Sequence, residues 1–194
     1  MLDRTKNIPD VTLNNLLAPS IRLFGNVNDV MFGSFQSQLD SVLRSDANIT
    51  LELSTTGGDA ETGRRIALDL RLAHEYRNKS LLFFGKSFIY SAGVTMMSAF
   101  KKEERFLSKD CVLLIHSRRT DQNVHYSGPL TSNVQLAEEM LASLKSGIKL
   151  ECAGFQNLAE GSKLSADDII KKASQNWYVA ADEALELGLV QGLI

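Results

Sequence analysis

The chain has 194 residues, of which 44% are hydrophobic and 23% charged, with a formal net charge of −2. This length and composition fit one globular domain, and no basic block is long enough to indicate a general nucleic-acid surface. No run of about 18 apolar residues occurs, and the polar segment 1–19 lacks the features of a signal peptide, so we expect a soluble cytoplasmic protein without a membrane span.

After residue 19, short apolar runs alternate with segments of helical periodicity. The expected strands are 20–27, 48–55, 80–88, 105–108, 111–117 and 189–194. The expected helices are 29–46, 60–77, 93–100, 131–155, 165–176 and 181–188. The order strand–helix–strand predicts right-handed crossovers and an α/β core. We expect segment 1–19 to precede a single domain, 20–194.

The longest predicted helix carries an apolar seam. Its members recur at spacings of three and four residues: Val134, Ala137, Leu141, Leu144 and Ile148. This is the spacing of a helix that packs along its length against another helix. A polar loop, 118–129, precedes this helix.

Three of the predicted strands end in residues that could carry chemistry. Gly57 and Gly58 follow one strand, Ser91 follows the next, and His116 ends a third. The carboxyl ends of parallel strands lie along one edge of a sheet, where ligands bind. We therefore expect the diglycine, the serine and the histidine to meet at that edge.

Acyl transfer uses this set of groups. An imidazole can take the proton of a serine hydroxyl, and backbone N–H donors stabilise the oxyanion that forms. A diglycine turn lets the backbone approach a substrate closely. A serine at a helix N-terminus adds the N–H of the next residue, here Ala92.

Each of these residues also has an ordinary structural interpretation. Ser91 could be a helix N-cap, the glycines a simple turn, and His116 a half-buried strand residue. The segment "IYSAG" is not a complete GxSxG motif, because Ile89 stands at the first glycine position. The catalytic hypothesis therefore depends on the convergence of three strand ends.

The two cysteines do not indicate a metal site. Neither Cys111 nor Cys152 belongs to a CxxC pair or a Cys/His cluster. We expect buried free thiols and no metal or cofactor.

Four segments occur in a distinctive order along nearly the whole chain. They are "ITLELSTTGGDAETGRRIALDLR", "SFIYSAGVTMMSAF", "RFLSKDCVLLIHS" and "YVAADEALELGLVQGL". Together they resemble the Clp protease proteolytic subunit family, the ClpP-like serine peptidases, from about Ile21 to Gly192. The resemblance implies an α/β fold of the ClpP/crotonase type, with repeated ββα units and a protruding handle helix at about 131–155.

The resemblance also implies roles for individual residues. Ser91 matches the nucleophile, His116 the general base, and Gly58 and Ala92 the backbone donors of the oxyanion hole. It implies a homo-oligomeric ring, stacked in pairs through the handle, that acts on protein or peptide substrates. An AAA+ unfoldase is a possible partner; nucleic acid and membrane are not expected.

The chain departs from the family pattern in three places. The loop 118–129 is longer and more polar, segment 1–19 does not resemble the family's gating loops, and the position of the catalytic aspartate holds Lys172. Asp168 lies one turn earlier, but "SADD" also fits a capping box with Ser165 as N-cap. The candidates for a third catalytic group are Asp168, its neighbour Asp167, Asp121 in the loop, or none, which leaves a dyad.

Three functions are therefore considered. The first is a serine endopeptidase inside a ring. The second is a ClpP-like subunit with an impaired site, acting as a structural or regulatory ring component. The third is a crotonase-type acyl-CoA enzyme, which shares the fold and the oxyanion hole but is disfavoured because the chain is short and that chemistry needs no serine nucleophile.

Overall fold

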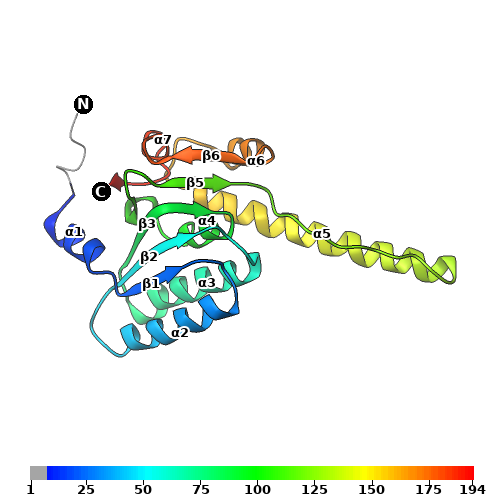
Figure 1. Ribbon diagram of the computed structural model, residues 1–194, viewed down its shortest axis with the longest axis horizontal. Coiled ribbons are helices and arrows are strands. Elements are labelled where there is room, and N and C mark those ends of the chain that lie inside the picture. The colour runs from blue at the N-terminus through cyan, green and yellow to red at the C-terminus, as the bar shows by residue number, and fades with distance from the viewer. Residues whose placement is uncertain (1–7) are drawn as a thin grey trace.

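The computed structural model describes residues 8–194 and contains a seven-stranded sheet with helices packed against it (Figure 1). The strands are β1 (Ile21–Phe24), β2 (Ile49–Thr55), β3 (Leu81–Tyr90), β4 (Arg105–Leu107), β5 (Val112–Ile115), β6 (Trp177–Ala180) and β7 (Gly192–Leu193). The helices are α1 (Asp10–Leu17), α2 (Asp29–Leu43), α3 (Ala60–Arg77), α4 (Ala92–Met97), α5 (Leu130–Ala159), α6 (Ala166–Ala173) and α7 (Ala181–Glu186), with a 3₁₀ turn at Lys102–Glu104. The predicted α/β class is confirmed.

The sheet is parallel apart from one edge. Its order is β1–β2–β3–β4–β7, and β5 also pairs with β3; among the strand pairs of residues 8–194, only β5–β6 is antiparallel. The long strand β3 has two successive neighbours on one side: Phe83–Gly85 pairs with β4 and Phe88–Tyr90 pairs with β5. Because β5 continues beyond the end of β4, the carboxyl ends of β3 and β5 lie side by side. Ser91 and His116 follow these two ends.

Alternation along β3 separates two clusters of apolar side chains. Phe83 belongs to the main core, where its ring lies 5.3 Å from that of Phe100. Phe84 points to the other face and packs with Leu16 and Phe106. Successive strand residues point to opposite faces, so the sheet is covered on one face by the main core and on part of the other by α1.

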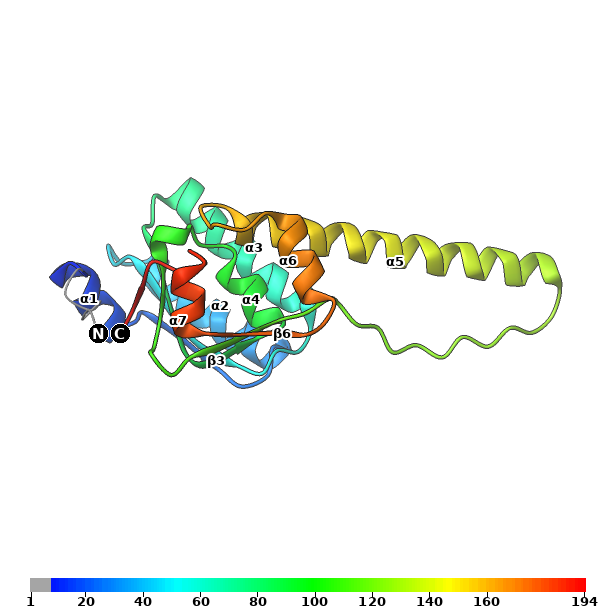
Figure 2. The ribbon, with the colours of Figure 1, turned by 90° about the horizontal axis from the view of Figure 1, so that it is seen from above.

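The helix α5 projects from the domain (Figure 1, Figure 2). At a rise of 1.5 Å per residue it is about 45 Å long, and only Phe155 and Leu158, near its C-terminal end, are buried. The connecting segment after β5 runs beside it to its far end (Figure 2). All five residues of the predicted seam are exposed in the single chain, with Val134 58% and Ile148 59% accessible.

The C-terminal end of α5 is held by a buried cation. Arg105 is 1% exposed, and its guanidinium donates to backbone carbonyls of Phe100, Asn157, Leu158 and Leu189. Burial lowers the Arg105 pKa to about 10, still far above neutrality. The helix therefore continues past the predicted end at residue 155, because Arg105 satisfies carbonyls of its last turn.

Besides the 3₁₀ turn, one helix and one strand lie outside the predicted set. Helix α1 falls in segment 1–19, where polar residues dilute the helical pattern and only Leu16 is buried. Strand β6 has just four residues, and it depends on antiparallel pairing with β5 rather than on apolar alternation. Within residues 8–194, no helix is long and apolar enough to cross a membrane.

Candidate active site

Ser91 occupies a strained turn between β3 and α4. Its backbone has φ +55° and ψ −113°, outside the left-handed helical region that other residues sometimes adopt. Ser91 stands at the N-cap position of α4, but its side chain makes no hydrogen bond that caps the helix. A sharp strand-to-helix turn of this kind presents a serine hydroxyl at the edge of a sheet. The elbow forms without a GxSxG motif, and Ile89 is a fully buried core residue.

The diglycine turn lies directly against this elbow. Gly57 has φ +94°, and a Cβ atom placed on it would lie 2.7 Å from the Ser91 Cβ. Gly58 pairs with Val27 through the Gly57 carbonyl and the Asp59 N–H, with N–O distances of 2.9 and 2.8 Å. The Gly58 N–H takes no part in this pairing with Val27. Both positions therefore require glycine for more than the turn itself, since a side chain would collide with Ser91 or with the Val27 backbone.

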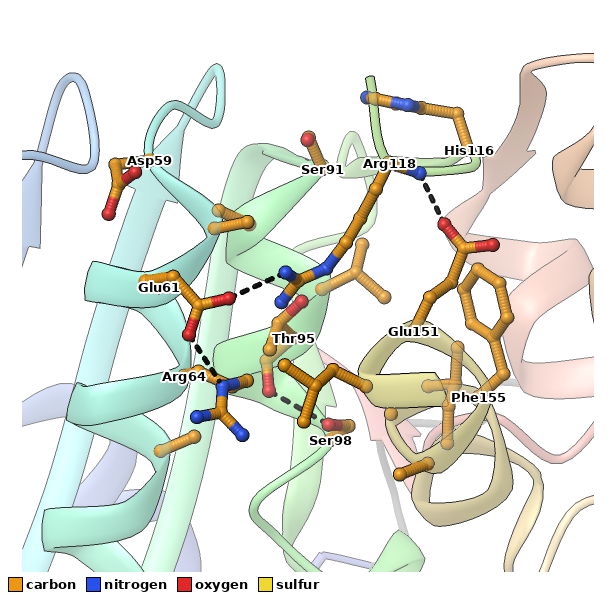
Figure 3. Close-up of a pocket in the computed structure, with 18 of the residues that line it drawn as sticks. Asp59, Glu61, Arg64, Ser91, Thr95, Ser98, His116, Arg118, Glu151 and Phe155 are labelled. Carbon is orange, nitrogen blue, oxygen red and sulfur yellow. Dashed lines mark hydrogen bonds and ion pairs between the residues drawn. The ribbon is translucent and has the colours of Figure 1, made fainter. Parts of the chain in front are cut away.

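His116 follows β5 and lies at the rim of the same cavity as Ser91 (Figure 3). The Ser91 N–H donates to the carbonyl of Leu114, at 2.9 Å, which ties the elbow to β5. In Figure 3 the imidazole is directed toward the side on which Ser91 lies, although no hydrogen bond joins the two side chains. His116 Nδ1 instead lies 2.7 Å from the backbone carbonyl of Ser117. Donation from Nδ1 to this carbonyl leaves Nε2 as the basic nitrogen.

The three candidate aspartates make no hydrogen bond to His116. Asp168 accepts hydrogen bonds from the side chain and N–H of Ser165, which forms the predicted capping box, and these bonds lower the Asp168 pKa. Asp167 and Asp121 are exposed.

Lys172, which the resemblance places at the family's aspartate position, lies against another partner. Its ammonium lies 4.7 Å from the centre of the Trp177 ring. The backbone of this helix end nevertheless reaches the site, because the Ser117 N–H donates to the Ala173 carbonyl at 3.3 Å. The α6 segment therefore meets the histidine segment through main-chain atoms.

The cavity below Ser91 has a volume of about 630 Å³ and walls from α3, α4, α5 and the segment after β5. Arg118 crosses it to Glu61, with 2.6 Å between Nη1 and Oε1, and Arg64 binds the other oxygen of that carboxylate (Figure 3). These hydrogen bonds, that of Arg118 first, lower the Glu61 pKa. The carboxylate of Glu151, on α5, accepts a hydrogen bond from the Arg118 N–H. A substrate side chain in this cavity would therefore meet charged as well as apolar groups.

Sequence reasoning did not select Glu61, Arg118 or Glu151. Arg118 stands two residues after His116, so its place near the site could have been foreseen. Glu151 lies 33 residues from its partner along the chain, on a helix that reads as an ordinary amphipathic one. The proximity of Glu151 to the site becomes visible only where α5 meets the segment after β5.

No metal centre is evident in the part of the chain that the structure describes. There, no three His, Cys, Asp or Glu side chains gather as metal ligands. Cys111 is buried, which raises its pKa to about 12, and Cys152 is partly buried; both thiols are free.

The fold and this site together define an α/β protein with a strained serine elbow at the carboxyl edge of its sheet. The model of the Clp protease family matches residues 5–194, so the chain belongs to the Clp protease family.

Comparison with known proteins agrees with this assignment. The chain is 22% identical over 196 residues to the ATP-dependent Clp protease proteolytic subunit 3 of Rhizobium johnstonii and of Rhizobium etli, covering 99% of this chain and 93% of each relative. It also resembles the structure of a ClpP1 mutant from Listeria monocytogenes, with a TM-score of 0.71 and 22% identity over 95% of each chain. The ClpP-type fold and the family resemblance are thus confirmed.

Proposed function

We propose that this protein is a serine endopeptidase that hydrolyses peptide bonds with Ser91 as nucleophile and His116 as general base. The observation that carries the proposal is the strained conformation of Ser91. Such strain persists only where the surrounding structure imposes it, and it is concentrated at active sites. An ordinary N-cap serine would have extended backbone geometry and a bond to the helix.

The arrangement provides a chemical group for each step of acyl transfer. His116 Nε2 takes the proton of the Ser91 hydroxyl as its oxygen attacks the substrate carbonyl carbon, and it later protonates the leaving amine. The N–H groups of Gly58 and Ala92 would stabilise the oxyanion. Ala92 is the first residue of α4, where an N–H has no partner within the helix. Water then hydrolyses the acyl-enzyme, again with His116 as base.

The test is labelling with a fluorophosphonate probe, followed by identification of the modified residue and assay with fluorogenic peptides. Ser91→Ala should lose both labelling and cleavage, with a rate loss of several orders of magnitude. Ser98→Ala is the matched control, because Ser98 lines the same cavity while its hydroxyl is bonded to the Thr95 carbonyl at 2.8 Å. Equal turnover by wild type and Ser91→Ala would refute the nucleophile assignment.

A second candidate function is a ring subunit with an impaired site. The observation in its favour is that no carboxylate of residues 8–194 bonds to His116, and the resemblance places Lys172 at the position of the family's aspartate. Absence of probe labelling at Ser91 in a folded, assembled protein would favour this alternative.

Assembly into stacked rings through α5 is part of the proposal. It is supported by the exposure of the seam, since a monomer rarely leaves an apolar strip of this length in water. The names of the Rhizobium relatives, which include the term ATP-dependent, support an AAA+ unfoldase as partner.

A further inference from the structure

We propose that Glu151 is a positioning residue that acts on His116 through the single peptide group between Ser117 and Arg118. This inference rests on the proposed function for its kinetic test, but its geometry does not depend on activity. It concerns how the histidine is oriented in a site where no side-chain carboxylate binds it.

The two relevant hydrogen bonds use the two ends of one peptide group. The carbonyl oxygen of Ser117 lies 2.7 Å from His116 Nδ1, and the N–H of Arg118 donates to the carboxylate of Glu151 (Figure 3). A peptide group is planar and trans, so its C=O and N–H point in opposite directions. Fixing the N–H on Glu151 therefore fixes the direction of the carbonyl that receives the Nδ1 proton.

The charge of Glu151 also polarises the peptide group between Ser117 and Arg118. An N–H that donates to a carboxylate forms a strong, charge-assisted bond, and hydrogen bonds in a chain polarise one another. The Glu151 carboxylate therefore makes the Ser117 carbonyl a better acceptor for Nδ1–H. A catalytic histidine needs this acceptor, because it selects the tautomer in which Nε2 is the base.

Other contacts hold the two residues that this peptide group joins. The Ser117 N–H donates to the Ala173 carbonyl, and the Arg118 side chain binds Glu61. Of these contacts, only that of Glu151 joins a side-chain carboxylate to the N–H of the peptide whose carbonyl meets His116. Since Glu151 lies on α5, the handle helix itself supports the histidine.

The experiment compares Glu151→Ala, Glu151→Gln and Glu138→Ala, the last an exposed glutamate on the same helix. Glu151→Ala should lower kcat for a fluorogenic peptide by roughly 10- to 100-fold with little change in KM, as expected when a catalytic group is misplaced. Glu151→Gln keeps an acceptor oxygen and should stay within about threefold of wild type. Glu138→Ala should match wild type.

A second readout does not need activity. In ¹⁵N NMR of histidine-labelled protein, with His116 assigned through His116→Gln, spectra are recorded at a pH at which the imidazole is neutral, and the wild type should show the proton on Nδ1. Glu151→Ala should shift His116 toward a mixture of tautomers, while Glu151→Gln should retain the Nδ1 form.

The outcomes separate the two proposals. A change of the His116 tautomer in Glu151→Ala that is absent from Glu151→Gln, with a kcat loss that in an active enzyme is likewise confined to Glu151→Ala, would support the positioning role. Identical His116 signals in wild type and Glu151→Ala, or equal kcat losses in Glu151→Ala and Glu151→Gln, would overturn it. If the wild type shows neither labelling nor cleavage, the proposed function fails, and the NMR comparison still tests the role of Glu151.

Discussion

Replacing Gly57 by alanine should both destabilise the protein and slow the reaction of Ser91 with a fluorophosphonate. The new Cβ would lie 2.7 Å from the Ser91 Cβ and 3.0 Å from the Tyr90 carbonyl oxygen. Neither neighbour can move easily, because Ser91 is held by its bond to Leu114 and Tyr90 pairs with β5. The turn or the serine elbow must therefore shift.

Two separate free-energy costs contribute to the destabilisation expected in Gly57→Ala. A non-glycine residue at the positive φ of +94° costs about 1–2 kcal/mol, and forcing a methyl group into a closely packed site costs about 1–3 kcal/mol. Gly25 separates these costs, because its φ is +89° and nothing lies within 4 Å of a Cβ placed there. Gly25→Ala should therefore lower the free energy of unfolding by about 1–2 kcal/mol, the cost of the positive φ alone. Gly57→Ala should lower it by about 2–5 kcal/mol in total.

Both variants should be compared with wild type by denaturant unfolding at one subunit concentration, since assembly changes apparent stability. The probe reaction should slow at least about tenfold in Gly57→Ala, because the nucleophile is displaced, and should be unchanged in Gly25→Ala. If Gly57→Ala were no less stable than Gly25→Ala and reacted at the wild-type rate, the proposed contact between the turn and the elbow would be refuted.

Four other substitutions test three separate parts of the structure. Leu141→Glu places a charge in the exposed seam and should halve the mass of a stacked assembly in light scattering, whereas a wild-type monomer at micromolar concentration would contradict assembly. Asp168→Asn should leave peptide cleavage unchanged, because its carboxylate caps α6, while Lys172→Asp should raise the rate if the carboxylate reaches His116 and stabilises its cation; strong loss in Asp168→Asn would show that it serves the histidine. Arg105→Met should lower unfolding free energy by about 3 kcal/mol, since several buried carbonyls lose their donor, and an unchanged melting curve would contradict this.

Much of the fold could be predicted from the sequence, because the spacing of apolar residues over short segments indicates strands and helices. Apolar runs such as 80–88 favoured strands covered on both faces, and the apolar seam within 131–155 indicated a long helix. The places of Gly57, Ser91 and His116 at strand ends followed from the strand order alone. Parallel topology brings such ends to one edge, so the meeting of these residues was predictable.

The tertiary structure decided the details that depend on contacts between distant segments. The conformation of Ser91 arises from packing against the Gly57 turn, not from a GxSxG motif, so the local sequence gave no sign of it. Likewise, Asp168 fits a capping box or a catalytic acid equally well by spacing, and only its bond to Ser165 shows which contact it makes. The support of His116 by Glu151 requires a backbone N–H, which every residue except proline possesses. No residue type marks such a donor, and only the position of α5 against the end of β5 selects it.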